Sequence, residues 1–149
     1  MPDYIDASAL AAVMLREPAS HAVDDLARVR SDTLFVSDLC LAECTSALAA
    51  FARRKNWSRS QTDGLWPELD DWVAIAAQSI PTEAEDVARA ISIVRNFDLK
   101  LRASDAIHVA TTARLEARLI TLDKRMARAA TALGLACLNP ADAVGAQKD

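Results

Sequence analysis

The chain has 149 residues, of which 52% are hydrophobic and 26% are charged. A chain of this length and composition can fold as one compact domain with its own core, which excludes a disordered protein. No apolar stretch is long enough to cross a bilayer, and no basic region followed by an apolar one opens the N-terminus. We therefore expect a cytoplasmic protein that does not associate with membranes.

The formal net charge of -4 argues against an open, basic surface for nucleic acid. That argument fails if the acids gather in a metal pocket, because bound cations then supply the positive potential that phosphates seek. The three cysteines are an odd number, and no His or Cys cluster completes a zinc site. We expect small buried thiols in place of disulfides or a zinc centre.

The first half of the chain alternates strand and helix patterns. In order these are a strand at 4–5, helices at 8–16 and 19–30, a strand at 33–37 and a helix at 39–55. Apolar side chains at spacings of three and four predict the buried stripe of the last of these helices, namely Leu41, Cys44, Leu48 and Phe51. Ser58 and Gln61 form a capping box that opens a fourth helix, which Gly64 and Pro67 interrupt before it resumes over 69–76.

The second half continues the alternation. Residues 78–80 suggest a minimal edge strand, a helix follows from a capping box at Thr82 and Glu85, and the remaining elements are a helix at 104–116, a strand at 118–122, a helix at 124–133 and a strand at 135–138. The fifth helix should bury the apolar stripe Val87, Ala88, Ile91, Val94 and Phe97. Gly134 should end the last helix, and the strand at 118–122 is too apolar for an exposed edge.

This alternation predicts an α/β fold, with a mostly parallel sheet of four or five strands covered by helices on both faces. We expect a single domain over residues 1–140, followed by a frayed tail at 141–149. No linker, repeat or low-complexity region divides the chain.

Four carboxylates occupy related places in these elements. Asp6 and Asp123 each follow a strand, Asp105 opens a helix, and Glu43 lies early in another helix. Ligands of such sheets bind beyond the carboxyl ends of the strands, so the four side chains can face one crevice. Converging carboxylates raise one another's pKa, and hard cations such as Mg²⁺ or Mn²⁺ relieve that conflict. Two ions about 4 Å apart would support hydrolysis of a phosphodiester.

Four sequence blocks together resemble the PIN domain, and within it the VapC-type toxin ribonucleases. They occur in the family's order at 4–10, 41–48, 104–110 and 119–126, and the similarity spans roughly residues 3–138. The resemblance implies a three-layer α/β/α sandwich and a metal-dependent endoribonuclease. It also implies an RNA substrate, with transfer RNA one candidate, a cognate antitoxin that blocks the site, and a homodimer.

The resemblance also implies roles for individual residues. Asp6, Asp105 and Asp123 would hold Mg²⁺ or Mn²⁺ directly or through water, while Glu43 would complete the set and orient the attacking water. Ser8 and Thr121 fall on polar positions that support these acids in the family.

Each of these residues also has an ordinary structural interpretation. Asp6 can cap the helix after it, Asp105 is a first-turn acid favoured by the helix dipole, and Asp123 can simply end a strand. Glu43 can be a solvated residue on a helix face. A hydrogen-bonded, partly buried His108 is favoured over a general base, because a metal-bound water needs no imidazole.

The best candidates for binding an RNA backbone are basic residues in two short clusters, Arg53 with Arg54 and Lys124 with Arg125. Lys124 and Arg125 directly follow Asp123, so they should start near the crevice. The alternative for both clusters is a solvated helix end.

Two rival functions remain at this stage. A non-catalytic module would keep the fold and bind RNA or protein without cutting, although the intact carboxylates argue against it. A receiver-type signalling domain would need an adjacent acidic pair after the first strand, where Asp6 is instead followed by Ala7 and Ser8.

Overall fold

A parallel sheet forms the middle of the computed structural model, which describes residues 1–29 and 33–145. Within these ranges the sheet has five strands in the order β3-β2-β1-β4-β5, and every neighbouring pair is parallel. The strands are β1 (Asp3–Ile5), β2 (Leu34–Ser37), β3 (Gln78–Ile80), β4 (Arg118–Ile120) and β5 (Cys137–Leu138). The predicted parallel sheet is confirmed, with β3 at an edge and β4 inside.

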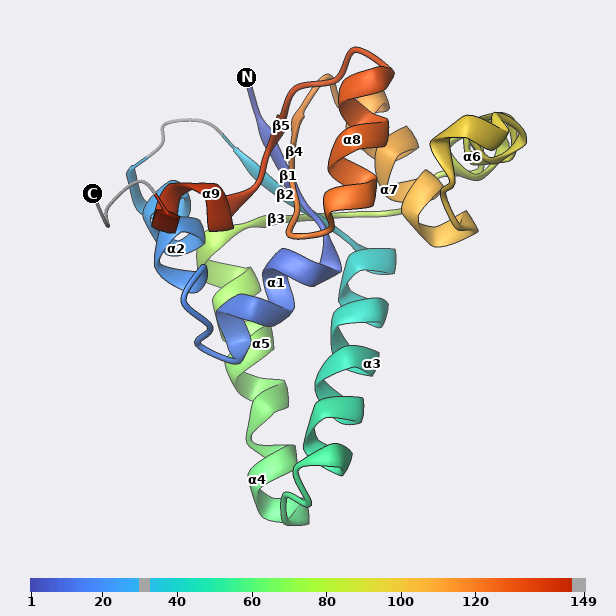
Figure 1. The fold of residues 1–149 in the computed structure, drawn as a ribbon. Coiled ribbons are helices and arrows are strands. Elements are labelled where there is room, and N and C mark those ends of the chain that lie inside the picture. Colours follow the sequence, from blue (N-terminus) through green and yellow to red (C-terminus); the bar gives the residue numbers. More distant parts are fainter. Residues whose placement is uncertain (30–32, 146–149) are drawn as a thin grey trace.

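Helices connect the strands and cover the sheet (Figure 1). They are α1 (Ala7–Met14), α2 (Ser20–Val29), α3 (Asp38–Arg54), α4 (Arg59–Asp63), α5 (Leu65–Ala76), α6 (Ala84–Arg95), the short 3-10 helix η1 (Phe97–Leu99), α7 (Ala103–Arg114), α8 (Lys124–Ala132) and α9 (Pro140–Gly145).

Successive strand residues point to opposite faces of the sheet, so each face has its own core. Ile5, Val36 and Ile120 pack with α1, α2, α3 and α5 on one face. Tyr4 and Leu119 pack with α6, α7 and α8 on the other face. The predicted three-layer α/β/α sandwich is therefore confirmed.

Local signals place several helix ends where the sequence predicts them. Ser58 and Gln61 form the expected capping box at the start of α4. Gly64 separates α4 from α5 as predicted, but the helix resumes at Leu65 and not at 69. Pro67 does not interrupt it, because it lies within the first turn of α5, where a missing N–H is tolerated. Gly134 follows α8 with φ of 79°, a conformation that favours glycine.

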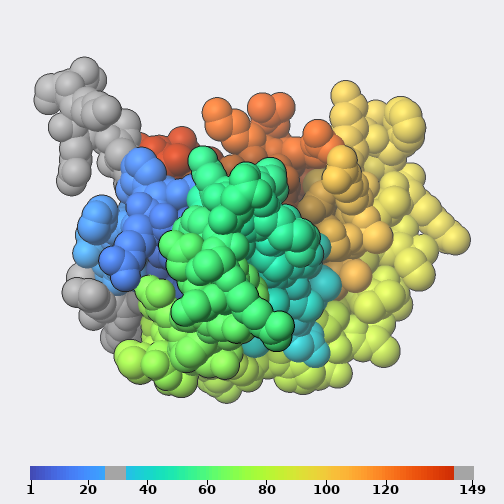
Figure 2. Space-filling view, turned by 90° about the horizontal axis from the view of Figure 1, so that it is seen from below, coloured from blue at the N-terminus to red at the C-terminus, as the bar shows by residue number. Residues whose placement is uncertain are grey.

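The prediction for the buried face of α6 was wrong. Val87, Ala88, Ile91, Val94 and Phe97 are all exposed, and the helix instead buries Ala90, Ile93 and Asp86. Its main neighbour is α7, and it lies at the edge of the molecule away from α2 (Figures 1 and 2). Apolar periodicity identified the helix correctly, but only its position at this edge decides which side is covered.

The predicted capping box of α6 was also shifted by one residue. Glu83 is the N-cap, and its backbone N–H donates to Asp86 at 3.0 Å. Thr82 instead donates from both its backbone N–H and its hydroxyl to Asp38. Thr82, which the local pattern assigned to the N-cap, is therefore hydrogen-bonded to a side chain of α3 instead.

The predicted tail begins later than expected, because residues 140–145 form α9, which contacts α2. Residues 146–149 lie outside the described ranges. Among the described helices, none combines the length and the apolar run that crossing a bilayer requires.

Two buried ion pairs connect elements that are distant in sequence. Arg118 of β4 donates two hydrogen bonds to Asp3 of β1, at 2.8 and 3.1 Å, and Arg114 of α7 donates two to Asp86 of α6, both at 2.8 Å. Burial is the largest single effect and raises the pKa of Asp86, but the hydrogen bonds from Arg114 and from the Glu83 backbone, with the charge of Arg114, together bring the pKa below its usual range. The Arg114 guanidinium therefore holds a buried negative charge in place.

We expect Arg114→Ala to lower the free energy of unfolding by about 3 kcal/mol near neutral pH, because Asp86 then keeps its buried charge without a partner. The depressed pKa means that the pair stabilises the fold above the range in which an unfolded Asp titrates. This contribution is lost as the pH falls through the folded pKa. Urea denaturation near neutral pH and near pH 3 should show a difference from wild type that shrinks in acid.

Arg59→Ala is the matched control, since it removes an exposed ion pair of 3.6 Å to Asp63. It should change the free energy of unfolding little. An equally small effect of Arg114→Ala would contradict the structural role of the buried pair.

Candidate active site

The predicted site residues lie at one edge of the sheet. Asp6 directly follows β1, Thr121 and Asp123 follow β4, and Glu43 lies in the second turn of α3, which follows β2. The chain passes from β1 to β2 and β3 on one side and later returns to β4 on the other. The strand order therefore reverses beside β1, the point where sheets of this type bind ligands.

Asp6 is the most constrained of these residues, with only 1% of its surface exposed. It caps α1 by accepting a 3.0 Å hydrogen bond from the backbone N–H of Ala9. The Ser8 hydroxyl donates to both carboxylate oxygens, at 2.8 and 2.9 Å, and the Thr121 hydroxyl donates at 2.7 Å. Capping was the ordinary interpretation of Asp6, and here it coexists with complete burial.

Ser8 and Thr121 are themselves held by the chain after β4. The Ser8 hydroxyl accepts from the backbone N–H of Leu122, and the Thr121 hydroxyl accepts from that of Asp123, both at 3.0 Å. Each hydroxyl thus accepts one hydrogen bond and gives its proton to Asp6. The two side chains join α1 to β4 and fix the direction of the Asp6 carboxylate.

The electrostatics of Asp6 set it apart from the two buried ion pairs. Burial raises its pKa, and hydrogen bonds from Thr121, Ala9 and Ser8 only partly offset this effect. Within residues 1–29 and 33–145 no ion pair joins Asp6 to a basic residue. A buried carboxylate that lacks a counter-charge at a strand end is typical of a cation or catalytic site.

Glu43, unlike Asp6, is partly exposed and forms a hydrogen bond with a histidine. Its side chain is 34% exposed, and Oε2 lies 2.6 Å from Nε2 of His108 on α7. This hydrogen bond is the main reason that the pKa of Glu43 lies below its usual range. Glu43 is therefore anchored through His108, which is buried with both ring nitrogens hydrogen-bonded, as the structural interpretation of that histidine expected.

Asp105 and Asp123 both serve helix starts. Asp105 accepts from the backbone N–H of Arg102 at 3.3 Å in the first turn of α7. Asp123 is the N-cap of α8, and its Oδ1 accepts from the backbone N–H groups of Arg125 and Met126. Among the residues that the structure describes, no hydrogen-bond donor to Oδ1 of Asp105 or Oδ2 of Asp123 is found.

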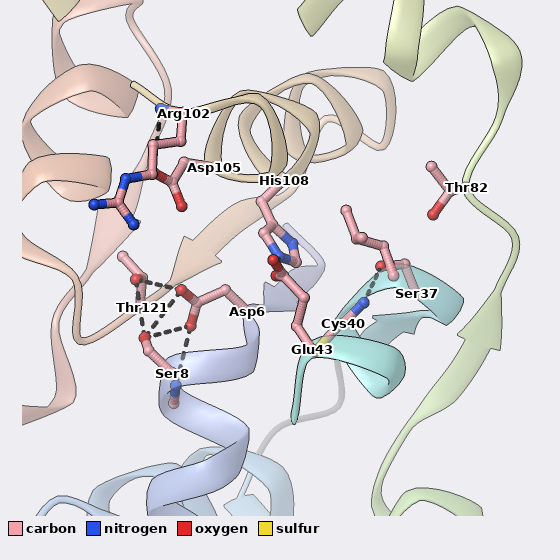
Figure 3. A network of polar contacts seen from close by, with 12 residues as sticks. Asp6, Ser8, Ser37, Cys40, Glu43, Thr82, Arg102, Asp105, His108 and Thr121 are labelled. Carbon is pink, nitrogen blue, oxygen red and sulfur yellow. Dashed lines mark hydrogen bonds and ion pairs between the residues drawn. The ribbon is translucent and has the colours of Figure 1, made fainter. Parts of the chain in front are cut away.

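Figure 3 shows Asp6, Glu43 and Asp105 around one region, with Ser8 and Thr121 beside Asp6 and His108 beside Glu43. Asp123 lies at the same edge, since its backbone N–H donates to Thr121, which donates to Asp6. Over the part of the chain that the structure describes, however, no three His, Cys, Asp or Glu side chains are close enough together to hold a metal ion. The donors fit a hard cation in chemistry, since they offer carboxylate oxygens.

The two basic clusters lie at different distances from this region. Lys124 and Arg125 are exposed in the first turn of α8, directly after Asp123. Arg53 and Arg54 are exposed at the opposite end of α3 from Glu43, about 15 Å along the helix at its usual rise.

Sequence reasoning did not assign any role at this site to Tyr4, Ser37 or Arg102. Tyr4 contacts both Ser37 and His108 at 2.7 Å, and Figure 3 shows Arg102 beside Asp105. The sequence could have indicated Tyr4, because it lies two residues before Asp6 and side chains at that spacing in an extended chain point to the same side. His108 similarly lies one turn after Asp105 on α7.

Comparison with protein families identifies the chain. The model of the PIN domain family matches residues 4–132, which is most of the sequence. The chain belongs to the PIN domain family. A search of curated protein sequences found no match.

Several solved structures share this fold. The chain is 15% identical to VapBC2 from Rickettsia felis, with a TM-score of 0.69 and coverage of 93% of this chain and 98% of that one. It is 17% identical to FitAcB from Neisseria gonorrhoeae, with a TM-score of 0.70 and coverage of 93% and 97%. It is 15% identical to VapC20 of Mycobacterium tuberculosis, described as a toxin that cleaves the sarcin-ricin loop, with a TM-score of 0.66 and coverage of 89% of this chain and 95% of that one.

At these identities the structural likeness establishes a VapC-like PIN fold and no more. The fold and the family that the four sequence blocks suggested are therefore confirmed. PIN domains generally use divalent metal ions, and the oxygen donors at the Asp6 edge of this PIN domain agree with that use.

We expect Mn²⁺ to raise the melting temperature of the wild-type PIN domain, by about 4 °C once the ion is about tenfold above its Kd. The physical reason is that the cation neutralises the buried charge of Asp6. Asp6→Asn should remove this response, and without metal it should melt no lower than wild type because it lacks that charge. Differential scanning calorimetry with and without Mn²⁺ measures both effects.

Asp63→Asn, a change at an exposed carboxylate of α4, should keep the full response to Mn²⁺. The metal assignment of Asp6 is wrong if Asp6→Asn responds to Mn²⁺ as wild type does.

Proposed function

We propose that this PIN-domain protein is a Mg²⁺- or Mn²⁺-dependent endoribonuclease that acts as the toxin of a cytoplasmic toxin-antitoxin pair. The observation that carries the proposal is the Asp6 carboxylate, which is buried, hydrogen-bonded to Ser8 and Thr121, and without an ion pair among the described residues. Three more carboxylates come from neighbouring elements at the same edge of the sheet.

Each acid has a distinct part in the proposed reaction. Asp6, Asp105 and Asp123 hold the cation directly or through water, and Ser8 and Thr121 keep Asp6 in one orientation. Glu43, which is partly exposed, completes the acidic set around the cation and orients the water that attacks the phosphorus atom. When bound, the divalent ion lowers the pKa of water and stabilises charge on the phosphodiester oxygens.

The RNA backbone would be bound first by Lys124 and Arg125, since they are exposed and directly follow Asp123. Arg53 and Arg54 could contact a longer substrate along α3, and a folded RNA such as transfer RNA is large enough to reach them. Binding through these few cations should weaken steeply with salt, as phosphate contacts do.

An antitoxin partner is supported by the complexes among the structural relatives, which include VapBC2, FitAcB and a toxin-antitoxin complex from Klebsiella pneumoniae. This chain has a groove of about 730 Å³ along α1, α2 and α5 that suits a protein segment. Val13, Met14 and Trp72 line it, and the exposed Arg16–Glu68 ion pair lies beside it at 3.3 Å.

A homodimer is also part of the proposal, and α6 offers a surface for it. Val87, Ile91 and Val94 are 43%, 51% and 40% exposed on this helix. With Ala90 and Ile107 they border a hollow of about 310 Å³ between α6 and α7 whose walls are almost entirely apolar. A continuous apolar surface of this kind is typical of a protein contact, and a second copy would cover it.

The alternative function is a non-catalytic PIN module that binds RNA or protein. It is favoured by the capping roles of Asp105 and Asp123, which give both acids a reason to be present without metal. Capping does not explain the burial of Asp6, so we rank this alternative second.

We expect the purified protein to cleave RNA only with Mg²⁺ or Mn²⁺, and excess EDTA should stop the reaction. Asp6→Asn and Asp105→Asn should each lower the rate at least about a hundredfold, because each removes a charge that holds the cation. Gel analysis of structured RNA, transfer RNA included, measures the rate, and circular dichroism verifies that the variants fold. Expression of wild type, but not of Asp6→Asn, should arrest bacterial growth.

Undiminished cleavage in EDTA would defeat the metal mechanism. A metal-binding protein that cuts no RNA would instead favour the non-catalytic module. Asp63→Asn, far from the strand ends, should retain the wild-type rate in the same assay.

We expect Ile91→Asp to convert the proposed dimer to a monomer, because it places a charge in the middle of the apolar surface of α6. Analytical ultracentrifugation at micromolar concentration measures the mass. Ile75→Asp is the matched control, since Ile75 of α5 is 87% exposed but lies on the other side of the sheet. A monomeric wild type, or equal dissociation of both variants, would refute this role for α6.

A further inference from the structure

A buried chain of hydrogen bonds leads from the end of β2 to Glu43. Ser37 Oγ lies 2.7 Å from Tyr4 Oη, which lies 2.7 Å from His108 Nδ1, and His108 Nε2 lies 2.6 Å from Glu43 Oε2. Ser37, Tyr4 and His108 are each at most 1% exposed. The chain therefore joins β2, β1, α7 and α3 without contact with water until it reaches Glu43.

The direction of these hydrogen bonds follows from Ser37, the first residue of the hydrogen-bond chain. Ser37 Oγ accepts a hydrogen bond from the backbone N–H of Cys40 as the N-cap of α3, so its own proton is available to Tyr4. Tyr4 then donates its proton to Nδ1 of His108. With Nδ1 as an acceptor, the single imidazole proton lies on Nε2 and is donated to Glu43.

The opposite direction leaves polar groups unsatisfied. If Nδ1 donated to Tyr4, Tyr4 would donate to Ser37, and the Ser37 hydroxyl proton would find no other acceptor in the described parts of the chain. In a neutral ring the lone pair of Nε2 would also face the Glu43 carboxylate. Buried polar groups without partners are costly, so the complete chain is the stable arrangement.

We propose that His108 is a positioning residue, whose neutral imidazole is fixed by Tyr4 and Ser37 and holds the Glu43 carboxylate in place for the cation and its water. This inference rests on the proposed function and deepens it. It differs from a general-base role, since His108 is buried behind Glu43, its N–H proton is donated to Glu43 and the lone pair of Nδ1 accepts from Tyr4.

The physical benefit is preorganisation. A partly exposed glutamate has three rotatable bonds, and fixing such a side chain costs roughly 1.5–2 kcal/mol of conformational entropy. The short hydrogen bond from Nε2 restricts Glu43 before any ligand arrives. Tyr4 lies in β1 and Asp6 directly follows that strand, so one short stretch of chain contributes to the placement of two acids of the site.

The test compares Tyr4→Phe, His108→Leu and His108→Gln with wild type. The Kd for Mn²⁺ is measured by electron paramagnetic resonance of the free ion, which needs no catalysis, and the cleavage rate is measured beside it. We expect about a tenfold higher Kd in Tyr4→Phe and in His108→Leu. His108→Gln should restore much of the affinity, because its amide nitrogen can occupy the place of Nε2 and donate to Glu43.

Thr112→Val is the matched control. The Thr112 hydroxyl is buried on α7 and donates to the backbone carbonyl of His108 at 2.8 Å, without contact with the ring. Its loss should lower thermal stability much as Tyr4→Phe does, yet leave the Kd for Mn²⁺ unchanged. The proposal is overturned if Tyr4→Phe and His108→Leu keep the wild-type Kd, or if Thr112→Val raises it equally.

The ¹⁵N chemical shifts of the His108 ring separate this proposal from the proposed function. The expected spectrum shows a protonated Nε2 and an unprotonated Nδ1 in wild type, and a mixture of tautomers in Tyr4→Phe. A protonated Nδ1 in wild type would overturn the hydrogen-bond chain whether or not the protein cuts RNA. A protein with the expected tautomer that binds Mn²⁺ but never cleaves RNA would contradict the ribonuclease alone.

Discussion

The buried charge of Asp6 is the constraint on which the arrangement at this edge of the sheet depends. Its carboxylate caps α1 and accepts protons from Ser8 and Thr121, so that β1, α1 and the segment after β4 meet at one group. The donors of these hydrogen bonds are all uncharged groups, and burial still raises the pKa of Asp6. The fold therefore maintains an electrostatic cost at this position, in contrast to Asp3 and Asp86, whose charges arginine side chains balance.

A single carboxylate can serve both a helix and a site. Asp6, Asp105 and Asp123 each accept backbone hydrogen bonds at the start of a helix. For Asp6 and Asp123 this follows from their place after β1 and β4, because the carboxyl ends of parallel strands are also where the following helices begin. Helix N-termini favour negative charge, which makes it less costly to gather several acids there. Capping and cation binding are therefore compatible functions of the same side chains.

One side of α6 stabilises the fold, and another side of the same helix is exposed. The face of α6 that packs against α7 is held by the Arg114–Asp86 pair, which leaves the apolar side with Val87, Ile91 and Val94 open. The groove along α1 and α5 lies on the other side of the sheet. Because these two surfaces lie on opposite sides of the sheet, the proposed second copy and the proposed partner protein would not compete for the same surface.

The sequence by itself determined the alternation of strands and helices, the parallel α/β/α fold, the caps at Ser58 and Gly134, and the four acids at strand and helix ends. These features depend on local periodicity and on neighbours within a few residues, which a single sequence records. Only the tertiary structure decided that α6 exposes its apolar stripe, that Thr82 contacts Asp38, and that Tyr4, Ser37 and His108 form a chain to Glu43. Those outcomes depend on which elements lie side by side, and no local pattern encodes contacts between residues 33 to 104 positions apart.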